Sequence, residues 1–131
     1  MSITERFIQV LIVDDHEIVR KSIMAMLARE PDMQVVGTAG NGREAIQSAQ
    51  ILEPDVIVMD VSMPELDGIR AAGKIQALDI STQIIMLSMH HNSALVQQAR
   101  KNGAAAYILK QEAPSELIPA IRAAYAGDLS L

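Results

Sequence analysis

Residues 56–64 read Val-Ile-Val-Met-Asp-Val-Ser-Met-Pro, a continuous apolar run that ends in an acidic residue and a turn. A short continuous apolar run bounded by turn residues is typical of a strand buried on both faces, and such strands occur in parallel sheets. Further runs of this kind occur along the chain, so the sequence predicts a parallel sheet. The predicted strands are residues 9–13, 34–37, 56–59, 84–87 and 106–109.

The segments between the predicted strands have apolar residues at helical spacing. Val19, Ile23 and Leu27 share one helical face in the first of them. Asn41 followed by Glu44 predicts the start of the second helix, because this pair can cap a helix reciprocally, and residues 53–54, Glu-Pro, predict its end. Strand–helix units with right-handed crossovers place helices on both faces of a parallel sheet, so the predicted fold class is doubly wound α/β.

The composition restricts the possible functions. The 131 residues suffice for one domain with its own core, and only 2% of them are aromatic. The net charge of -5 and the scarcity of aromatic residues argue against direct nucleic-acid binding. Without cysteine there is no disulfide, thiolate zinc site or cysteine nucleophile. No apolar run approaches the roughly 20 residues of a membrane-spanning helix, so we expect a cytoplasmic protein.

Polar residues follow the predicted strands where their carboxyl ends meet. Asp14 and Asp15 follow the first strand, Asp60 the third, Ser88 the fourth and Lys110 the fifth. Ligands of such sheets bind at this edge, and clustered carboxylates repel one another unless a cation lies among them. Mg²⁺ suits oxygen ligands and usually shares its shell with a phosphoryl group, whose other oxygens Lys110 and Ser88 are suited to hold. The sequence therefore predicts a phosphoryl-transfer site.

Each of these residues also has an ordinary structural interpretation. Aspartates such as Asp14 and Asp15 commonly cap helices, and a serine at a strand end commonly bonds to local backbone. A tyrosine at position 107 can simply be half-buried packing with a solvated hydroxyl. We interpret the three histidines as solvated loop residues rather than a transition-metal site, since no cysteine supports one. The histidines are His16, His90 and His91.

Four motifs together resemble the response regulator receiver domain. They are VDDHE at residues 13–17, MDVSMP at residues 59–64, Ser88, and the Gly-Ala pair at residues 103–104 with Tyr107 and Lys110. The resemblance covers about residues 9–127. The DDHE opening and the step from Lys110 to Gln111 are similar to the NarL/FixJ (LuxR-type) subfamily. The resemblance implies a flavodoxin-like (βα)5 fold, with a five-stranded sheet in the order 2-1-3-4-5.

The resemblance also implies a phosphoacceptor and a metal site. Asp60 would accept a phosphoryl group from a phosphohistidine of a histidine kinase. Asp14, Asp15, Asp60 and the backbone carbonyl of Ser62 would hold Mg²⁺.

Three further residues have roles implied by the resemblance. Lys110 would pair with the phosphoryl oxygens, and the Ser88 hydroxyl would move toward them. Tyr107 would be the switch aromatic that turns inward. Such a domain catalyses only its own phosphorylation and dephosphorylation, so we do not expect a conventional enzyme.

For residues 1–131 we expect a single receiver domain. Residues 128–131 look like the start of a linker to an absent helix-turn-helix output domain that binds DNA and controls transcription, with a stand-alone receiver as the alternative. Dimerisation on phosphorylation is a further expectation. Two other classes share parts of the pattern. A haloacid dehalogenase-type phosphohydrolase needs a second aspartate where this chain has Ser62, and a flavodoxin-like cofactor carrier needs a hydroxyl-rich phosphate loop that is absent.

Two positions conflict with the predicted helices. Gly73 lies inside the third helix at a cost of about 1 kcal/mol relative to alanine. If Ser115 caps the last helix, Pro119 falls just beyond its first turn, where the missing N–H and the ring clash cost ~3 kcal/mol. We therefore expect a late start or a kink at Pro119, and a reshaped partner surface.

Overall fold

The computed structural model describes residues 6–127 and contains one parallel five-stranded sheet in the order β2-β1-β3-β4-β5. The predicted fold class and strand order are thus confirmed, while the proposed linker, residues 128–131, lies outside the described residues. The strands are β1 Ile8–Val13, β2 Met33–Ala39, β3 Val56–Asp60, β4 Gln83–Ser88 and β5 Ala104–Leu109. The helices are α1 Glu17–Ala28, α2 Gly42–Leu52, α3 Gly68–Gln76, α4 Ser93–Lys101 and α5 Ala113–Tyr125, with a 3-10 turn at Lys110–Glu112.

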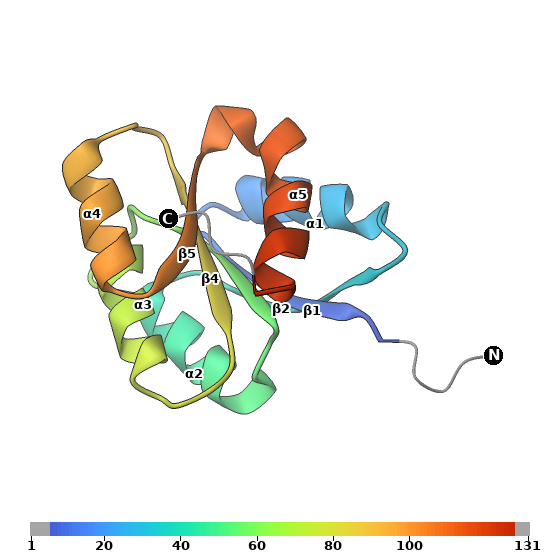
Figure 1. Ribbon diagram of the computed structural model, residues 1–131, viewed down its shortest axis with the longest axis horizontal. Helices are drawn as coiled ribbons and strands as arrows, with labels where there is room; N and C mark the ends of the chain where they lie inside the picture. Colours follow the sequence, from blue (N-terminus) through green and yellow to red (C-terminus); the bar gives the residue numbers. More distant parts are fainter. Residues whose placement is uncertain (1–5, 128–131) are drawn as a thin grey trace.

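The helices cover both faces of the sheet, α1 and α5 on one side and α2, α3 and α4 on the other (Figure 1). Successive residues of a strand point to opposite faces. In β1, Val10 and Ile12 therefore pack into the core beneath α1 and α5, while Leu11 and Val13 pack into the second core. The doubly covered sheet explains why β1, β3 and β4 are continuous apolar runs. Across residues 6–127, no helix is long and apolar enough to cross a bilayer.

Strand β2 does not fit the prediction of burial on both faces. It lies at the edge of the sheet, and only its ends, Met33 and Ala39, are fully buried. Its register with β1 also shifts, since Val10 pairs with Val35 but Leu11 pairs with Gly37. Strand β5 lies at the other edge and is largely buried, so the exposure of the middle of β2 does not follow from edge position alone.

The predicted ends of α2 are confirmed. The Asn41 side chain accepts a hydrogen bond from the backbone N–H of Glu44 at 2.9 Å, and the Glu44 carboxylate accepts one from the N–H of Gly40 at 3.0 Å. The first bond satisfies an N–H group that the first helical turn leaves unpaired, and the second ties the residue before the cap to the helix. The helix ends at Glu53, which has a left-handed backbone with φ of 43°, just before Pro54.

The expected late start of the last helix is wrong. Helix α5 begins at Ala113, before Ser115, and continues through Pro119. Ser115 and Pro119 are both exposed. Water can therefore hydrate the Ser115 carbonyl, which has no N–H donor at Pro119. The alternative of a kink at Pro119 stays a prediction, and so does its effect on the partner surface.

Gly73 lies inside α3, as predicted, and the structure gives the reason for a glycine. A Cβ atom at this position would clash with the side chain of Asn102, the residue that ends α4. A glycine at this position thus leaves room for the Asn102 side-chain amide without displacing it.

Candidate functional site

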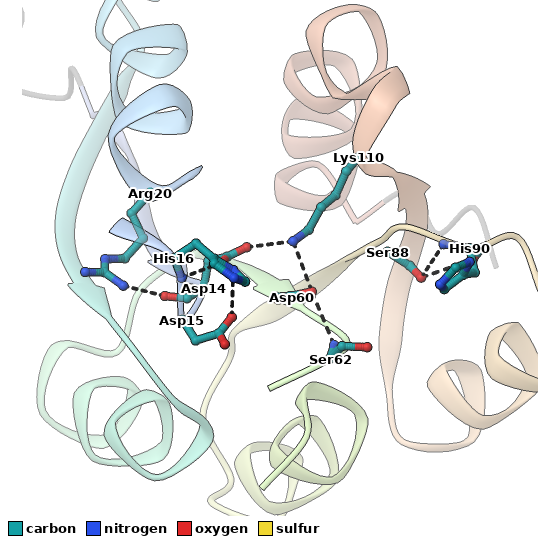
Figure 2. Close-up of polar contacts among 9 residues, drawn as sticks. All are labelled: Asp14, Asp15, His16, Arg20, Asp60, Ser62, Ser88, His90 and Lys110. Atoms are coloured by element: carbon teal, nitrogen blue, oxygen red, sulfur yellow. Dashed lines mark hydrogen bonds and ion pairs between the residues drawn. The ribbon is translucent and has the colours of Figure 1, made fainter. Parts of the chain in front are cut away.

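Side chains from the ends of three strands meet at the carboxyl edge of the sheet. Figure 2 shows Asp14 and Asp15 after β1, Asp60 at the end of β3, and Lys110 after β5 pointing toward one another. The residues are far apart in the chain, and the parallel arrangement of β1, β3 and β5 places them side by side. Four of the residues predicted from the sequence are thus in one cluster.

Lys110 joins the acidic residues of this cluster. Its Nζ lies 3.0 Å from Asp14 Oδ2 and 3.3 Å from Asp60 Oδ1. Asp14 is 1% exposed and Asp60 is 3% exposed, so both carboxylates are buried. The Lys110 ammonium is the cation that compensates two buried negative charges.

The pKa values of Asp60 and Lys110 are both raised, and this has opposite effects on their charges. Burial, and then the charge of Asp14, raise the pKa of Asp60 despite the opposing effect of Lys110. Burial of the Lys110 ammonium lowers its pKa, but the hydrogen bond to Asp14 and the charges of Asp60 and Asp14 outweigh burial, so this pKa is raised. The cluster therefore favours a protonated lysine and disfavours a further negative charge at Asp60.

The loop after β3 fixes the Asp60 carboxylate. Asp60 Oδ1 accepts a hydrogen bond from the N–H of Ser62 at 3.2 Å. The loop itself is held by the N–H of Gly68, which donates to the carbonyl of Val61 at 2.9 Å. A Cβ atom at Gly68 would collide with the backbone carbonyl of Asp60. Gly68 thus allows the start of α3 to approach the strand end, a role that the sequence reasoning did not assign.

The turn between β1 and α1 fixes Asp14. Its Oδ1 accepts the N–H of His16 at 2.9 Å, and its backbone carbonyl accepts Arg20 Nη1 at 2.6 Å. The N-cap of α1 is His16, whose side chain makes no capping hydrogen bond. The interpretation of Asp14 and Asp15 as the helix cap is therefore wrong, since the cap position belongs to the next residue.

His16 is more than a solvated loop histidine. Its side chain is 67% exposed, yet Nδ1 lies 3.2 Å from Asp14 Oδ1 and 3.1 Å from Asp15 Oδ1. Sequence reasoning missed this contact and the one from Arg20. The available signal was the position of His16 directly after the acidic pair, which keeps its side chain near them.

The donor set fits a divalent cation. Asp15 Oδ1 is buried and accepts no hydrogen bond among the described residues, so one carboxylate oxygen remains unpaired at the site. One ligand atom each from Asp14, Asp15, His16 and Asp60 lies within 4.8 Å of the others. An unpaired buried carboxylate oxygen costs free energy unless a cation or water compensates it. The backbone N–H of Ser62 donates to Asp60, whereas no described contact involves the Ser62 carbonyl, which the sequence predicted as a metal ligand.

Residues 10–122 match the family model of the response regulator receiver domain. The chain belongs to the response regulator receiver family. It is 40% identical over 120 residues to the response regulator UvrY of Escherichia coli K12, covering 92% of this chain and 55% of UvrY. It is 34% identical over 122 residues to the nitrate/nitrite response regulator NarL of the same strain, covering 93% of this chain and 56% of NarL. The receiver chain thus spans about half the length of these curated relatives.

Solved receiver domains have the same fold. A two-component response regulator of the LuxR family from Aurantimonas sp. SI85-9A1 superposes with a TM-score of 0.91 at 34% identity, covering 95% of this chain and 89% of that one. The signal receiver domain of the response regulator NarL from Mycobacterium tuberculosis gives a TM-score of 0.89 at 30% identity, covering 93% and 98%. The receiver is therefore of the NarL/LuxR type.

Ser88 lies at the same edge of the receiver but outside the charged cluster. Its hydroxyl donates to the carbonyl of His90 at 3.0 Å and accepts the N–H of His90 at 3.1 Å. The hydroxyl of Tyr107 donates to the same carbonyl at 3.0 Å. Among the described contacts, none joins Ser88 to Asp60 or Lys110. In this conformation Ser88 makes the local backbone bonds that its ordinary interpretation predicts.

Proposed function

We propose that this receiver accepts a phosphoryl group on Asp60 from a histidine kinase in a Mg²⁺-dependent reaction. The observation that carries the proposal is the position of the Asp60 carboxylate between the Lys110 ammonium, 3.3 Å away, and the acidic pair. The N–H of Ser62 orients the same carboxylate. A nucleophile, a cation and a metal-binding set thus occupy one buried edge.

The transfer requires little covalent work from the receiver. An Asp60 carboxylate oxygen forms a bond to phosphorus as the phosphorus–nitrogen bond of the donor phosphohistidine breaks, and the electron pair leaves with the imidazole. The product is an acyl phosphate on Asp60. Such transfers depend on alignment and on neutralising the charge of the phosphoryl oxygens. Lys110 can contact those oxygens because its Nζ is already within 3.3 Å of Asp60.

Asp14, Asp15, Asp60 and the Ser62 carbonyl are the proposed Mg²⁺ ligands. A bound Mg²⁺ would supply positive charge to the phosphoryl oxygens. Asp15 Oδ1 supports this assignment, since it is buried and accepts no hydrogen bond from any described residue. Oxygen donors also suit the preference of Mg²⁺ for hard ligands.

Ser88 and Tyr107 are the proposed switch residues. The Ser88 hydroxyl would have to release His90 before it could reach a phosphoryl oxygen, since His90 occupies both its donor and its acceptor capacity. Tyr107 would then turn inward into the space that Ser88 leaves. Contacts made only with the phosphorylated receiver would shift the equilibrium between two conformations.

An apolar groove supports docking of the kinase beside Asp60. The groove has a volume of 450 Å³ between α1 and the start of α5, and its walls include Ile18, Met26, Met89 and Lys110. Two of the apolar wall residues are largely exposed, Ile18 at 83% and Met89 at 63%. Lys110 lines the groove and also contacts Asp60. A kinase helix bound in the groove would therefore place its phosphohistidine near Asp60.

The output is proposed from the length of the relatives. We propose that residues 9–127 are one receiver domain of a longer cytoplasmic regulator with a C-terminal helix-turn-helix domain that binds DNA, and that phosphorylation favours a homodimer. The matched part of this chain covers only 56% and 55% of NarL and UvrY. The full open reading frame tests this proposal, because a stop codon after residue 131 would leave a stand-alone receiver.

Labelling with radioactive acetyl phosphate and Mg²⁺ tests the phosphoacceptor. The wild-type protein should take up label, and Asp60→Asn should take up none while keeping the same circular dichroism spectrum. Asp79→Asn is the matched control, since Asp79 is exposed and has a left-handed backbone that asparagine tolerates. Label on the Asp60 variant would contradict the proposal, and steady turnover of small phosphoesters would favour a phosphohydrolase instead.

A further inference from the structure

We propose that His16 is an additional metal ligand through Nδ1, so that this site prefers divalent transition ions that accept nitrogen, such as Co²⁺, over Mg²⁺. The inference rests on the proposed metal site and specifies its ligand chemistry. His16 is not among the Mg²⁺ ligands proposed above.

The distances fit an octahedral metal shell. Metal–ligand bonds of about 2.1 Å at right angles separate neighbouring ligand atoms by about 3.0 Å. His16 Nδ1 lies 3.1 Å from Asp15 Oδ1 and 3.2 Å from Asp14 Oδ1. Nitrogen and the two oxygens thus already have the spacing of adjacent ligands, and Figure 2 shows the imidazole beside both carboxylates.

The contact between His16 and Asp15 is not a hydrogen bond. Asp15 Oδ1 accepts no hydrogen bond from any described residue, even though His16 Nδ1 is 3.1 Å away. His16 Nδ1 instead makes its hydrogen bond to Asp14 Oδ1 at 3.2 Å, so the nitrogen faces an oxygen of each carboxylate. A metal ion can bind the deprotonated nitrogen together with both oxygens.

The imidazole also has no structural duty in α1. His16 is the N-cap of this helix, but its side chain makes no capping hydrogen bond. The backbone N–H of His16 makes the bond to Asp14 that holds the turn, and a substitution keeps this N–H. The side chain can therefore be removed without uncapping the helix.

The nitrogen of His16 should raise the affinity of the site for some metal ions and not for others. Imidazole suits Fe²⁺, Co²⁺, Ni²⁺ and Zn²⁺, whereas Mg²⁺ takes oxygen ligands almost exclusively. A site of carboxylates alone would discriminate weakly between these ions. One nitrogen donor at octahedral spacing should raise the affinity for Co²⁺ selectively.

Isothermal titration with CoCl₂ and with MgCl₂ at pH 7.5 tests the inference. The variants are His16→Ala and the control His91→Ala, which removes an exposed histidine elsewhere. We expect the ratio of the Co²⁺ to the Mg²⁺ association constant to fall roughly tenfold or more in His16→Ala, as for other losses at metal sites, and to stay constant in the control. His16→Asn, with a residue favoured at N-caps, gives a second measurement if the alanine variant unfolds.

Proton NMR of the Co²⁺ complex gives an independent signal. The wild-type complex should show hyperfine-shifted imidazole C–H resonances that are lost in His16→Ala. An unchanged affinity ratio, or the absence of these resonances, would overturn the role of His16 while leaving the Mg²⁺ site intact. Failure of the wild-type protein to bind either ion would instead overturn the proposed metal site itself.

Discussion

Lys110 Nζ lies 3.0 Å from Asp14 Oδ2, although 96 residues separate the two positions in the chain. The pair ties the end of β5 to the end of β1 across the carboxyl edge of the sheet. The same ammonium is 3.3 Å from Asp60 Oδ1, so one cation compensates two buried carboxylates. The proposed metal binding and phosphorylation would both act on this charge arrangement.

Replacing Lys110 by methionine should destabilise the metal-free protein. The change leaves two buried carboxylates without their cation, and the expected loss is about 1–3 kcal/mol, less than for a fully buried pair because Lys110 is 17% exposed. MgCl₂ should raise the melting temperature more in the variant than in the wild type, since the metal then replaces the missing charge. Thermal unfolding measures both effects, with exposed Lys101→Met as control. Equal melting temperatures without Mg²⁺ would contradict this role.

Asp60→Asn should stabilise the metal-free protein at neutral pH. Burial and the charge of Asp14 raise the pKa of Asp60 in the folded state, so ionised Asp60 opposes folding. This destabilisation is absent at pH values below the pKa of Asp60 in the unfolded state. It develops as the pH rises through the pKa of Asp60 in the folded state. The advantage of the variant in chemical denaturation should therefore shrink toward pH 3. An advantage that grows on acidification would contradict the assigned shift.

Gly68→Ala should destabilise the loop that holds Asp60. The new methyl group would collide with the Asp60 carbonyl, and such overpacking costs about 1–3 kcal/mol. Gly40→Ala is the matched control, since a Cβ there meets nothing closer than 3.5 Å. Urea denaturation compares the two, and phosphorylation of Gly68→Ala should slow as Asp60 moves. Equal stability of both variants would show that the loop adapts.

Arg122→Ala should lower stability in a way that depends on pH and salt. Arg122 Nε and Nη2 lie 3.0 and 2.9 Å from the two carboxylate oxygens of Asp32, and Nη2 lies 2.6 Å from Glu30. The hydrogen bond from Arg122 lowers the pKa of Asp32. Because the pKa of Asp32 is lower in the folded state, ionised Asp32 stabilises the folded protein at pH values above its unfolded-state pKa. This stabilisation is lost as the pH falls through the folded-state pKa.

The difference in melting temperature between wild type and Arg122→Ala should therefore be largest near neutral pH and low salt. It should shrink toward pH 3 and in 1 M NaCl, because exposed ion pairs are screened. Arg100→Ala, at an exposed arginine on α4, should show neither dependence.

The strands were predictable because a sheet covered on both faces requires continuous apolar runs. The cluster of Asp14, Asp60 and Lys110 was predictable because parallel strands bring their carboxyl ends together. Strand β2 departed from the rule, since its middle residues are only partly buried, and the local apolar run does not encode that exposure. The contacts of His16 and Arg20 depend on how the chain turns after Asp15, and propensities do not specify that turn.

The error at Pro119 has a physical origin in the choice of helix start. A cap at Ser115 was assumed, whereas the 3-10 turn leads into α5 and the cap is Glu112, three residues earlier. The penalty of proline was then assigned without knowing that this side of the helix faces water. Gly73 shows the converse, since the residue for which this glycine leaves room, Asn102, is 29 positions away and is brought close only by packing.

The carbonyl oxygen of His90 accepts hydrogen bonds from the hydroxyl groups of both Ser88 and Tyr107. If Ser88 turns away, that oxygen keeps a single donor, and the environment of the Tyr107 phenol changes with it. The chain has no tryptophan and only two tyrosines. Near-ultraviolet emission of the unlabelled protein can therefore follow the rearrangement in real time, with Tyr125 as the constant background.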